Sequence, residues 1–227
     1  MLNKREQSIA DRKARILDSA RSIISSDGFD GLTTRGLAQA AGVTVPTLYN
    51  LVGDKEAIVS AMASRSIEQL WERLQLEGRA SPMEMADAIL DEAFVQIMSE
   101  PEVNCATFIA LQRLGIAFAY HPTREDIGAH SARRCVEMAE YTCNSAQRIG
   151  QLRGILHARE LAIQMFAAYR AALDDWVHKA IDADEMLRRQ RIGFYTALAA
   201  DAADAFRDEL LARITRLSTI GLKTEVA

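Results

Sequence analysis

The stretch from Gly31 to Glu56, GLTTRGLAQAAGVTVPTLYNLVGDKE, most constrains what this chain can fold into. Thr33 and Thr44 are each placed to cap a short helix, because a threonine hydroxyl accepts a free N–H group of the first helical turn. Between them, Gly42 supplies the left-handed residue with which helices commonly end. Two short helices joined by such a turn form a helix-turn-helix, whose second helix has the size to enter a DNA major groove.

The apolar residues of this stretch have helical spacing. Leu37, Ala38 and Ala41 fall on one face of the first short helix, and Leu48 and Val52 point inward from the second. The remaining side chains are left to face a partner.

Lys55 gives a separate hint of phosphate binding. Asp54 is placed to cap the next helix, so a lysine at the first helical position opposes the helix dipole. A phosphate docked at this helix end would remove the conflict, since the lysine and the free N–H groups would both point at it. The alternative is a solvated surface lysine that costs a few tenths of a kcal/mol.

These residues resemble the TetR family of bacterial transcriptional regulators. The resemblance runs from about Arg15 to Ile58 and rests on the following matches: Gly28-Phe29, Gly31-Leu-Thr-Thr-Arg, Leu37-Ala, Ala41-Gly-Val-Thr, Thr47-Leu-Tyr and Lys55-Glu. The chain departs from the family pattern at three places. Asn50 replaces the usual histidine, Leu51-Val52 replaces an aromatic pair, and Val45-Pro46 stands where a basic residue and a glycine are common.

The resemblance implies DNA contacts at nine positions. Those carried over to the groove are Thr34, Arg35, Val45, Pro46, Thr47 and Asn50, and those carried over to phosphates are Thr44, Tyr49 and Lys55. Arg35 suits a bidentate contact with guanine, while Val45 and Thr47 suit a thymine methyl group. The phosphate contacts would fix register without reading sequence.

Composition and periodicity favour an all-α fold of about nine helices. The chain of 227 residues is 49% hydrophobic and has only four prolines. We expect a helix-turn-helix DNA-binding domain over residues 1–56 and a helical ligand-binding and dimerisation domain over 57–227. The net charge is −4, yet residues 1–26 carry six Lys/Arg against three acids. A basic end on an acidic body suits a protein that touches DNA with one end.

The apolar pattern also predicts where the individual helices lie. Residues 1–8 read as a frayed arm. The expected helices then cover 9–26, 55–76, 82–100, 102–121, 124–151 and 159–181, with a last one from 182 to about 218 that is kinked near Gly193. The segment 102–121 is apolar enough to be buried nearly all round.

The sequence offers little material for catalysis, so we expect no enzyme and no cofactor. The four histidines are scattered outside any metal-binding motif, and Asp174 with His178, four residues apart, is better read as a surface hydrogen bond or ion pair than as a metal site. The three cysteines lack metal-ligand spacing. With no signal peptide and no membrane-length apolar run, we expect a cytoplasmic protein without membrane contact.

The resemblance implies that the helical body encloses a small molecule and that the last two helices pair with a second subunit. No residue of the body matches a family motif, so the candidate pocket residues rest on composition, since aromatic and methionine side chains suit an adaptable apolar site. They are Met62, Phe94, Phe108, Gln112, Phe118, Tyr120, Met138, Met165, Phe166, Tyr169 and Trp176. The alternative for each is an ordinary core role.

The sequence is therefore interpreted as a TetR-like homodimeric repressor, released from a near-palindromic double-stranded DNA operator by a small apolar or amphipathic effector. Two alternatives stay open at this point. One is a helical enzyme or small-molecule carrier with an unused helix-turn-helix, and the other is a ligand-independent DNA-binding protein.

Overall fold

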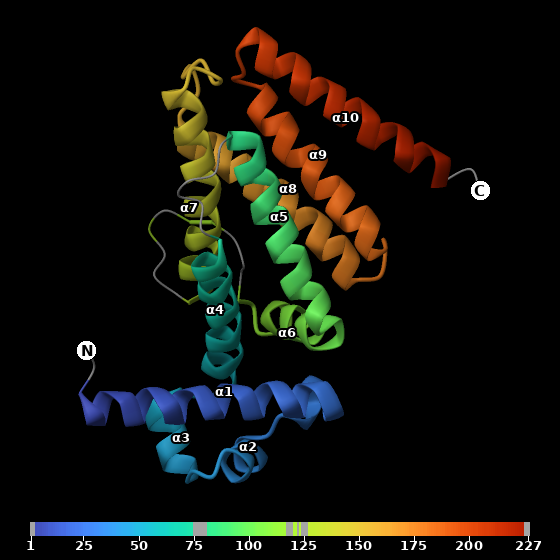
Figure 1. Ribbon diagram of the computed structural model, residues 1–227. Helices are drawn as coiled ribbons and strands as arrows, with labels where there is room; N and C mark the ends of the chain where they lie inside the picture. Colours follow the sequence, from blue (N-terminus) through green and yellow to red (C-terminus); the bar gives the residue numbers. More distant parts are fainter. Residues whose placement is uncertain (1–2, 75–80, 117–119, 122, 124–126, 225–227) are drawn as a thin grey trace. The chain divides into compact units, whose positions relative to one another are not determined.

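The computed structural model describes residues 3–74, 81–116, 120–121, 123 and 127–224, and this part of the chain is helical (Figure 1). Its ten helices are α1 (Lys4–Gly31), α2 (Thr34–Ala40), α3 (Val45–Leu51), α4 (Lys55–Arg73), α5 (Pro82–Ser99), α6 (Pro101–Arg113), α7 (Ile127–Arg148), α8 (Ala158–Val177), α9 (Ala183–Ala199) and α10 (Asp204–Thr224). The prediction of an all-α fold with about nine helices is confirmed.

The helices form two compact units. The first comprises Met1–Gln69 and Ile97–Ser131, and the second comprises Leu70–Gln96 and Ala132–Ala227. The expected boundary after residue 56 concerns the division of roles between DNA binding and ligand binding, and it stays a prediction.

The first helix begins earlier than expected. Asn3 accepts hydrogen bonds from the backbone N–H groups of Arg5 and Glu6, and the Glu6 carboxylate accepts the Asn3 N–H at 2.8 Å. This capping box satisfies free donors at both ends of the first turn, so α1 starts at Lys4 and the expected frayed arm is wrong for residues 4–8. At the other end, Gly28 has φ of 69°, which interrupts the helix where Asp27-Gly28 was expected to end it.

The core of the first unit joins the helix-turn-helix to α6. Ile16, Ala20, Leu37 and Leu48 are each 0% exposed, and the buried side chains of Val103, Ala110 and Leu111 on α6 belong to the same cluster. Two ion pairs, Arg21–Glu100 and Arg113–Asp30, join α1 and its end to the region of α6. A three-helix unit of this size buries little apolar surface alone. Helix α6 adds the further apolar side chains that complete this core.

Helix α6 is shorter and less buried than expected. It ends at Arg113 because Gly115 adopts φ of 68° and its N–H donates to the Gln112 carbonyl at 3.0 Å. The N–H of Ile116 donates to the Leu111 carbonyl at 2.9 Å, which completes a Schellman motif. The expected helix over 102–121 is therefore wrong at residues 114–116, 120 and 121, and residues 117–119 lie outside the described part of the chain. It is also not buried all round, because Glu102, Gln112 and Arg113 are exposed.

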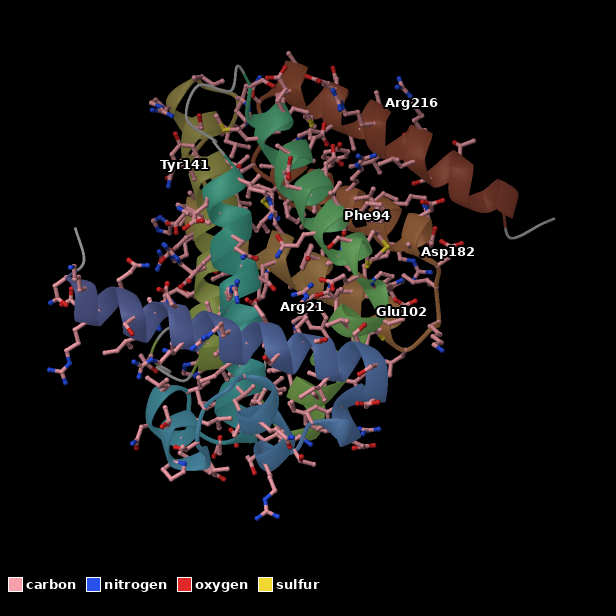
Figure 2. All side chains as sticks on the ribbon, turned by 60° about the horizontal axis from the view of Figure 1, so that its bottom comes forward. Arg21, Phe94, Glu102, Tyr141, Asp182 and Arg216 are labelled. Atoms are coloured by element: carbon pink, nitrogen blue, oxygen red, sulfur yellow. The ribbon has the colours of Figure 1, made fainter. Side chains whose placement is uncertain are left out.

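Two predicted helix starts are confirmed. Ser81 and Glu84 exchange hydrogen bonds of 3.2 Å in a capping box at the start of α5. Asp182, at the start of α9 (Figure 2), accepts the Glu185 N–H at 2.8 Å. Both signals are local, which is why the sequence alone shows them.

In the second unit α9 packs between α8 and α10 (Figure 1). Gly193 lies in the middle of α9 against Ala168 of α8, where a Cβ atom built on the glycine would stand 2.3 Å from the Ala168 Cβ. The glycine therefore permits a close approach of two helices, at a cost in helix propensity of about 1 kcal/mol relative to alanine. No break occurs at this position, so the kink expected near Gly193 is wrong.

The break lies instead at Ala200–Ala203, between α9 and α10. Asp201 is 1% exposed, and its carboxylate accepts the N–H groups of Gly154 at 2.8 Å and Ile155 at 3.0 Å. Its backbone carbonyl accepts the Arg153 N–H at 2.8 Å. These bonds to the segment between α7 and α8 replace helical ones, so the chain turns here.

A polar cluster fastens the same helices to α5. Tyr195 on α9 donates its hydroxyl hydrogen to Asp87 on α5, and Arg213 on α10 pairs with the other Asp87 oxygen at 3.3 Å. Burial, followed by the hydrogen bond to Asp87, raises the pKa of the Tyr195 hydroxyl to about 12. The phenol therefore stays a donor throughout the physiological pH range.

Candidate nucleic-acid interface

The turn between α2 and α3 has the geometry expected from its sequence. Thr33 accepts the Gly36 N–H at 3.2 Å and caps α2. Gly42 has φ of 65°, and the N–H of Val43 donates to the Ala38 carbonyl at 2.9 Å. The hydrogen bond of the Gly42 N–H to Gln39 completes a Schellman motif, which fixes the angle at which α3 leaves α2.

Helix α3 is capped at its start and anchored from below. Thr44 accepts the Thr47 N–H at 3.3 Å, and the two threonine hydroxyl oxygens lie 2.8 Å apart. Pro46 falls in the first turn, where a missing N–H costs no hydrogen bond. Leu48 is 0% exposed and holds the helix to the core of the first unit.

The predicted DNA contacts on α2 and α3 are open to solvent to different degrees. Arg35, Thr44, Pro46, Tyr49 and Asn50 are exposed, and Tyr49 keeps 49% of its surface although it is a large aromatic residue. The other predicted contacts on these helices are half-buried, and they are Thr34, Val45 and Thr47. Helices α2 and α3 pack against each other, so the structure brings both groups onto neighbouring elements.

Lys55 is the first residue of α4, as expected. Asp54 caps the helix by accepting the Ala57 N–H at 2.9 Å. The Lys55 ammonium lies 3.9 Å from the centroid of the Phe29 ring, a cation–π contact. The ring face offsets part of the unfavourable interaction between the lysine and the helix dipole. It also holds the charge at the end of α4, beside the helix-turn-helix.

The predicted pocket residues are divided between the two units. Met62, Phe108, Gln112 and Tyr120 belong to the first unit, where only Met62 is buried and Gln112 is exposed. The predicted residues in the second unit are Phe94 (labelled in Figure 2), Met138, Met165, Phe166, Tyr169 and Trp176. Met138, Met165 and Phe166 are buried, whereas the other three are half-buried. Phe118 lies outside the described residues.

Two residues that sequence reasoning did not single out as ligand contacts lie on the α7 face that carries Met138. Cys135 and Thr142 are seven residues apart, so both fall on the same helical face. Burial raises the pKa of the Cys135 thiol to about 12, and burial together with the neighbouring Cys135 raises that of the Tyr169 phenol on α8. Helical spacing from Met138 was the signal that could have found them.

Thr142 is 0% exposed, and its hydroxyl oxygen has no hydrogen-bond partner among the residues that the structure describes. An unsatisfied buried hydroxyl costs about 1–3 kcal/mol of stability. Such groups are therefore uncommon in native proteins, and each one calls for a structural or functional explanation.

The pair Asp174 and His178 has the contact expected from its spacing. The Nδ1 atom of His178 lies 2.9 Å from the Asp174 carbonyl oxygen and 3.7 Å from its carboxylate. Within the described residues there is no group of three or more His, Cys, Asp or Glu side chains that could hold a metal ion. In the same part of the chain no helix has the length and apolar character to cross a membrane.

A capped and anchored α3, presented beside α2 with exposed polar side chains, has the architecture of a helix-turn-helix, a motif that many proteins use to bind DNA. A family profile described as "Bacterial regulatory proteins, tetR family" matches residues 16–62. The tetracycline repressor protein class D of Escherichia coli is 46% identical over 48 residues, which make up 21% of this chain and 22% of that protein. The chain thus spans about a fifth of the length of this curated relative.

Solved structures extend the likeness in fold to the helical body. SmeT, the repressor of the Stenotrophomonas maltophilia multidrug efflux pump SmeDEF, superposes with a TM-score of 0.64 at 18% identity, over 86% of this chain and 92% of that one. A TetR transcription regulator from Haloarcula marismortui gives 0.66 at 14% identity, over 86% and 100%. The match to the TetR family profile thus covers the helix-turn-helix region of this chain, and the solved structures show that the helical body has the same fold as TetR-family regulators.

Proposed function

We propose that the protein is a transcriptional regulator that acts as a homodimeric repressor on a near-palindromic DNA operator and leaves it when a small apolar or amphipathic effector binds. The observation that carries the DNA-binding part is α3 itself. Its first turn is fixed by Thr44, its inner side is fixed by Leu48, and Tyr49 and Asn50 are exposed. A rigid helix with an open polar face suits a major groove.

We propose that Arg35 reads guanine, because it is exposed and its guanidinium can make a bidentate contact. Thr47 suits a thymine methyl group, since its hydroxyl is occupied by Thr44 and leaves the methyl for a base contact. Val45 takes the same apolar role, and Thr34, Pro46 and Asn50 complete the groove-facing set. Thr44, Tyr49 and Lys55 hold phosphates and fix the register.

We propose that α9 and α10 pair with the same helices of a second subunit. Inside the chain, α10 packs on α9, and Phe206 and Leu210 of α10 are buried. Leu211 is 48% exposed, and Ile214 and Leu217 follow it at three-residue intervals with half-buried side chains. This second apolar stripe supports a helix partner from another copy. Two-fold symmetry then places two α3 helices about 34–36 Å apart, one DNA turn.

We propose that the effector binds beside α7 and α8, next to Cys135, Thr142 and Tyr169. Burial raises the pKa of both the Cys135 thiol and the Tyr169 phenol, and both residues are half-buried. The unpartnered Thr142 hydroxyl offers one polar contact to an otherwise apolar ligand.

Helix α4 supports the coupling between effector and DNA. It begins at Lys55, four residues after α3 ends, and runs without a break to Arg73. We propose that an effector releases DNA by favouring a different spacing of the two α3 helices, which requires a differential affinity of a few kcal/mol. Crosslinking the two DNA-binding domains at operator spacing should abolish release. If an effector still released the crosslinked dimer, this coupling would be wrong.

The phosphate contact of Lys55 is tested by the salt dependence of DNA binding. The Lys55→Ala variant should bind all sequences more weakly and lower the slope of log K against log salt by about one unit. Arg170→Ala is the matched control, because it removes one exposed cation from α8 and should leave the slope unchanged. Lys55→Ala also removes the contact of the ammonium with the Phe29 ring. That contact affects the stability of the fold, whereas the slope of log K against log salt reports the number of phosphate contacts. An unchanged slope for Lys55→Ala would show that Lys55 does not contact a phosphate.

The base contact of Arg35 is tested by binding to a set of operators that each carry one substituted base pair. Arg35→Ala should lose discrimination at one base pair in each half-site, by about 1–3 kcal/mol, and keep it elsewhere. A loss that is equal for every sequence would show that Arg35 contacts phosphate alone.

A further inference from the structure

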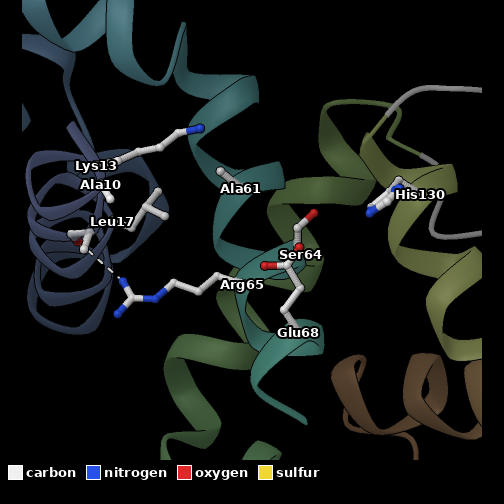
Figure 3. A pocket seen from close by; sticks show the side chains of 9 residues that line it. Ala10, Lys13, Leu17, Ala61, Ser64, Arg65, Glu68 and His130 are labelled. Carbon is white, nitrogen blue, oxygen red and sulfur yellow. Dashed lines mark hydrogen bonds between the residues drawn. The ribbon is translucent and has the colours of Figure 1, made fainter. Parts of the chain in front are cut away.

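A pocket of about 540 Å³ lies within the first unit, and none of its lining residues is among those proposed above for DNA or effector binding. Figure 3 shows that α1 forms one wall, α4 the second and the start of α7 the third. The residues that line it are Ala10, Lys13, Ala14, Leu17, Ala61, Ser64, Arg65, Glu68 and His130. None of them belongs to the helix-turn-helix surface, so the pocket needs its own explanation.

The wall between the charged groups is apolar and made of small side chains. Ala10, Ala14 and Ala61 contribute only methyl groups, and Leu17, which is 7% exposed, closes the wall of α1. Small side chains on two facing helices leave room for an apolar body of moderate size. Larger residues here would have filled the space.

Two cations reach the pocket from opposite helices. Lys13 on α1 is exposed, and its ammonium makes no hydrogen bond or ion pair with the described residues. Arg65 crosses from α4 to α1, where one terminal nitrogen donates to Asp18 at 2.7 Å and to the Ala14 carbonyl at 3.4 Å. Arginine carries five N–H donors, so the Nε and the other terminal nitrogen keep donors for a ligand.

Acidic groups are fewer at this pocket. Glu68 is the one carboxylate in the lining, and it is exposed on α4. Asp18 is engaged with Arg65 and lies outside the lining. Ser64 is bonded to Ser131 at 2.8 Å, so the polar character of the pocket comes mainly from Lys13, Arg65 and His130. The balance favours an anion of single charge.

We propose that this pocket binds a small amphipathic carboxylate, with the carboxylate on Lys13 and the apolar body against the alanines. A bare inorganic anion would leave the apolar wall unused, and a neutral apolar molecule would leave Lys13 unpaired. The chemistry of the lining therefore selects a molecule that has both parts.

Such a ligand bridges α1 and α4 inside the first unit. Helix α1 packs on both α2 and α3, so it supports the proposed DNA surface. A ligand with its carboxylate on Lys13 of α1 and its apolar body against Ala61 of α4 adds a second link to the one that Arg65 and Asp18 make. The site would thereby give the protein a second small-molecule input, separate from the effector site proposed beside α7 and α8.

The proposal is tested by binding of octanoate to the full chain labelled with ¹³C at the alanine methyl groups. Octanoate should shift the methyl signals of Ala10, Ala14 and Ala61, and neutral octanamide should bind at least several-fold more weakly. Lys13→Met should weaken octanoate binding by about threefold to fivefold, the range of an exposed ion pair. Arg15→Met is the matched control, because this exposed neighbour on α1 lies outside the lining and carries the same charge.

Ala10→Trp provides a second test without loss of charge. Ala10 is exposed, so a larger side chain should fill the pocket without disturbing the core, and octanoate binding should fall at least tenfold. Three results would overturn the proposal. These are octanoate shifts confined to other alanines, equal affinity for octanoate and octanamide, and equal effects of Lys13→Met and Arg15→Met.

Discussion

The contact between Gly193 and Ala168 makes a quantitative prediction about the second unit. A methyl group added at Gly193 would stand 2.3 Å from the Ala168 Cβ, whereas non-bonded carbon atoms prefer about 3.5–4.0 Å. Helices α8 and α9 would therefore have to separate by more than about 1 Å along their shared interface. The backbone of a helix cannot give way as the end of a flexible side chain can.

The magnitude follows from two opposing terms. Overpacking of a tight interface costs about 1–3 kcal/mol, and a displacement of this size belongs at the upper end. Replacing glycine by alanine inside a helix returns about 1 kcal/mol of helix propensity. Gly193→Ala should therefore destabilise the protein by about 2 kcal/mol, or about 4–8 °C in Tm for a chain of this length.

Thermal unfolding of four proteins, followed by circular dichroism, isolates the contact. Ala168→Gly alone should cost about 1 kcal/mol through helix propensity. The exchanged pair Ala168→Gly with Gly193→Ala should return close to the stability of the natural protein, because the clash disappears and the two propensity changes cancel. If Gly193→Ala raised Tm instead, as an unobstructed glycine-to-alanine change does, the close approach would be wrong.

Two further predictions concern single side chains. Thr142→Val should stabilise the ligand-free protein by about 1 kcal/mol, because it removes a buried hydroxyl that has no partner among the described residues. Thr107→Val is its control in the same unfolding assay and should not stabilise, since the buried Thr107 hydroxyl donates to Val103 at 2.7 Å; an equal gain in both would refute the reasoning. Glu185→Gln should show a pH-dependent cost, because the hydrogen bond from Arg188 lowers the pKa of Glu185 to about 2. The carboxylate then stabilises the fold above its unfolded pKa of about 4.3, so the Tm difference from the natural protein should close between about pH 4.5 and pH 2, and a constant difference would contradict the assignment.

The helix-turn-helix could be derived from sequence because its signals are local. The caps Thr33, Thr44 and Asp54 act within three residues of themselves, and Gly42 needs only its own turn. Helical spacing alone predicted that Leu48 points inward, and the residue is buried. The contact of Lys55 with Phe29 could not be foreseen, because it depends on how α4 meets the end of α1.

The errors in the rest of the fold have two physical origins. Gly115 is a local signal that the apolar run around it obscured, so α6 was expected to continue. The break at Ala200–Ala203 has no local signal, because the Asp201 carboxylate bonds to backbone groups about 46 residues away. An alanine-rich sequence looks helical until that partner segment is known.

The proposed small-molecule sites show the same limit. Met138 and Tyr169 could be selected by composition, but Cys135 and Thr142 gain meaning only when burial and hydrogen bonding are known. The pocket between α1, α4 and α7 was not expected, since alanines carry no compositional signal. Its two cations, Lys13 and Arg65, are 52 residues apart in sequence.

We propose that α3 reads a specific DNA sequence, and a fluorescence-anisotropy titration measures this binding. The probe is labelled DNA from beside the protein's own gene, measured at two salt concentrations against scrambled competitor. We expect tight binding that resists the competitor, with two subunits or a multiple of two at each site. Binding that scrambled DNA competes away equally, or no binding at either salt concentration, would contradict it.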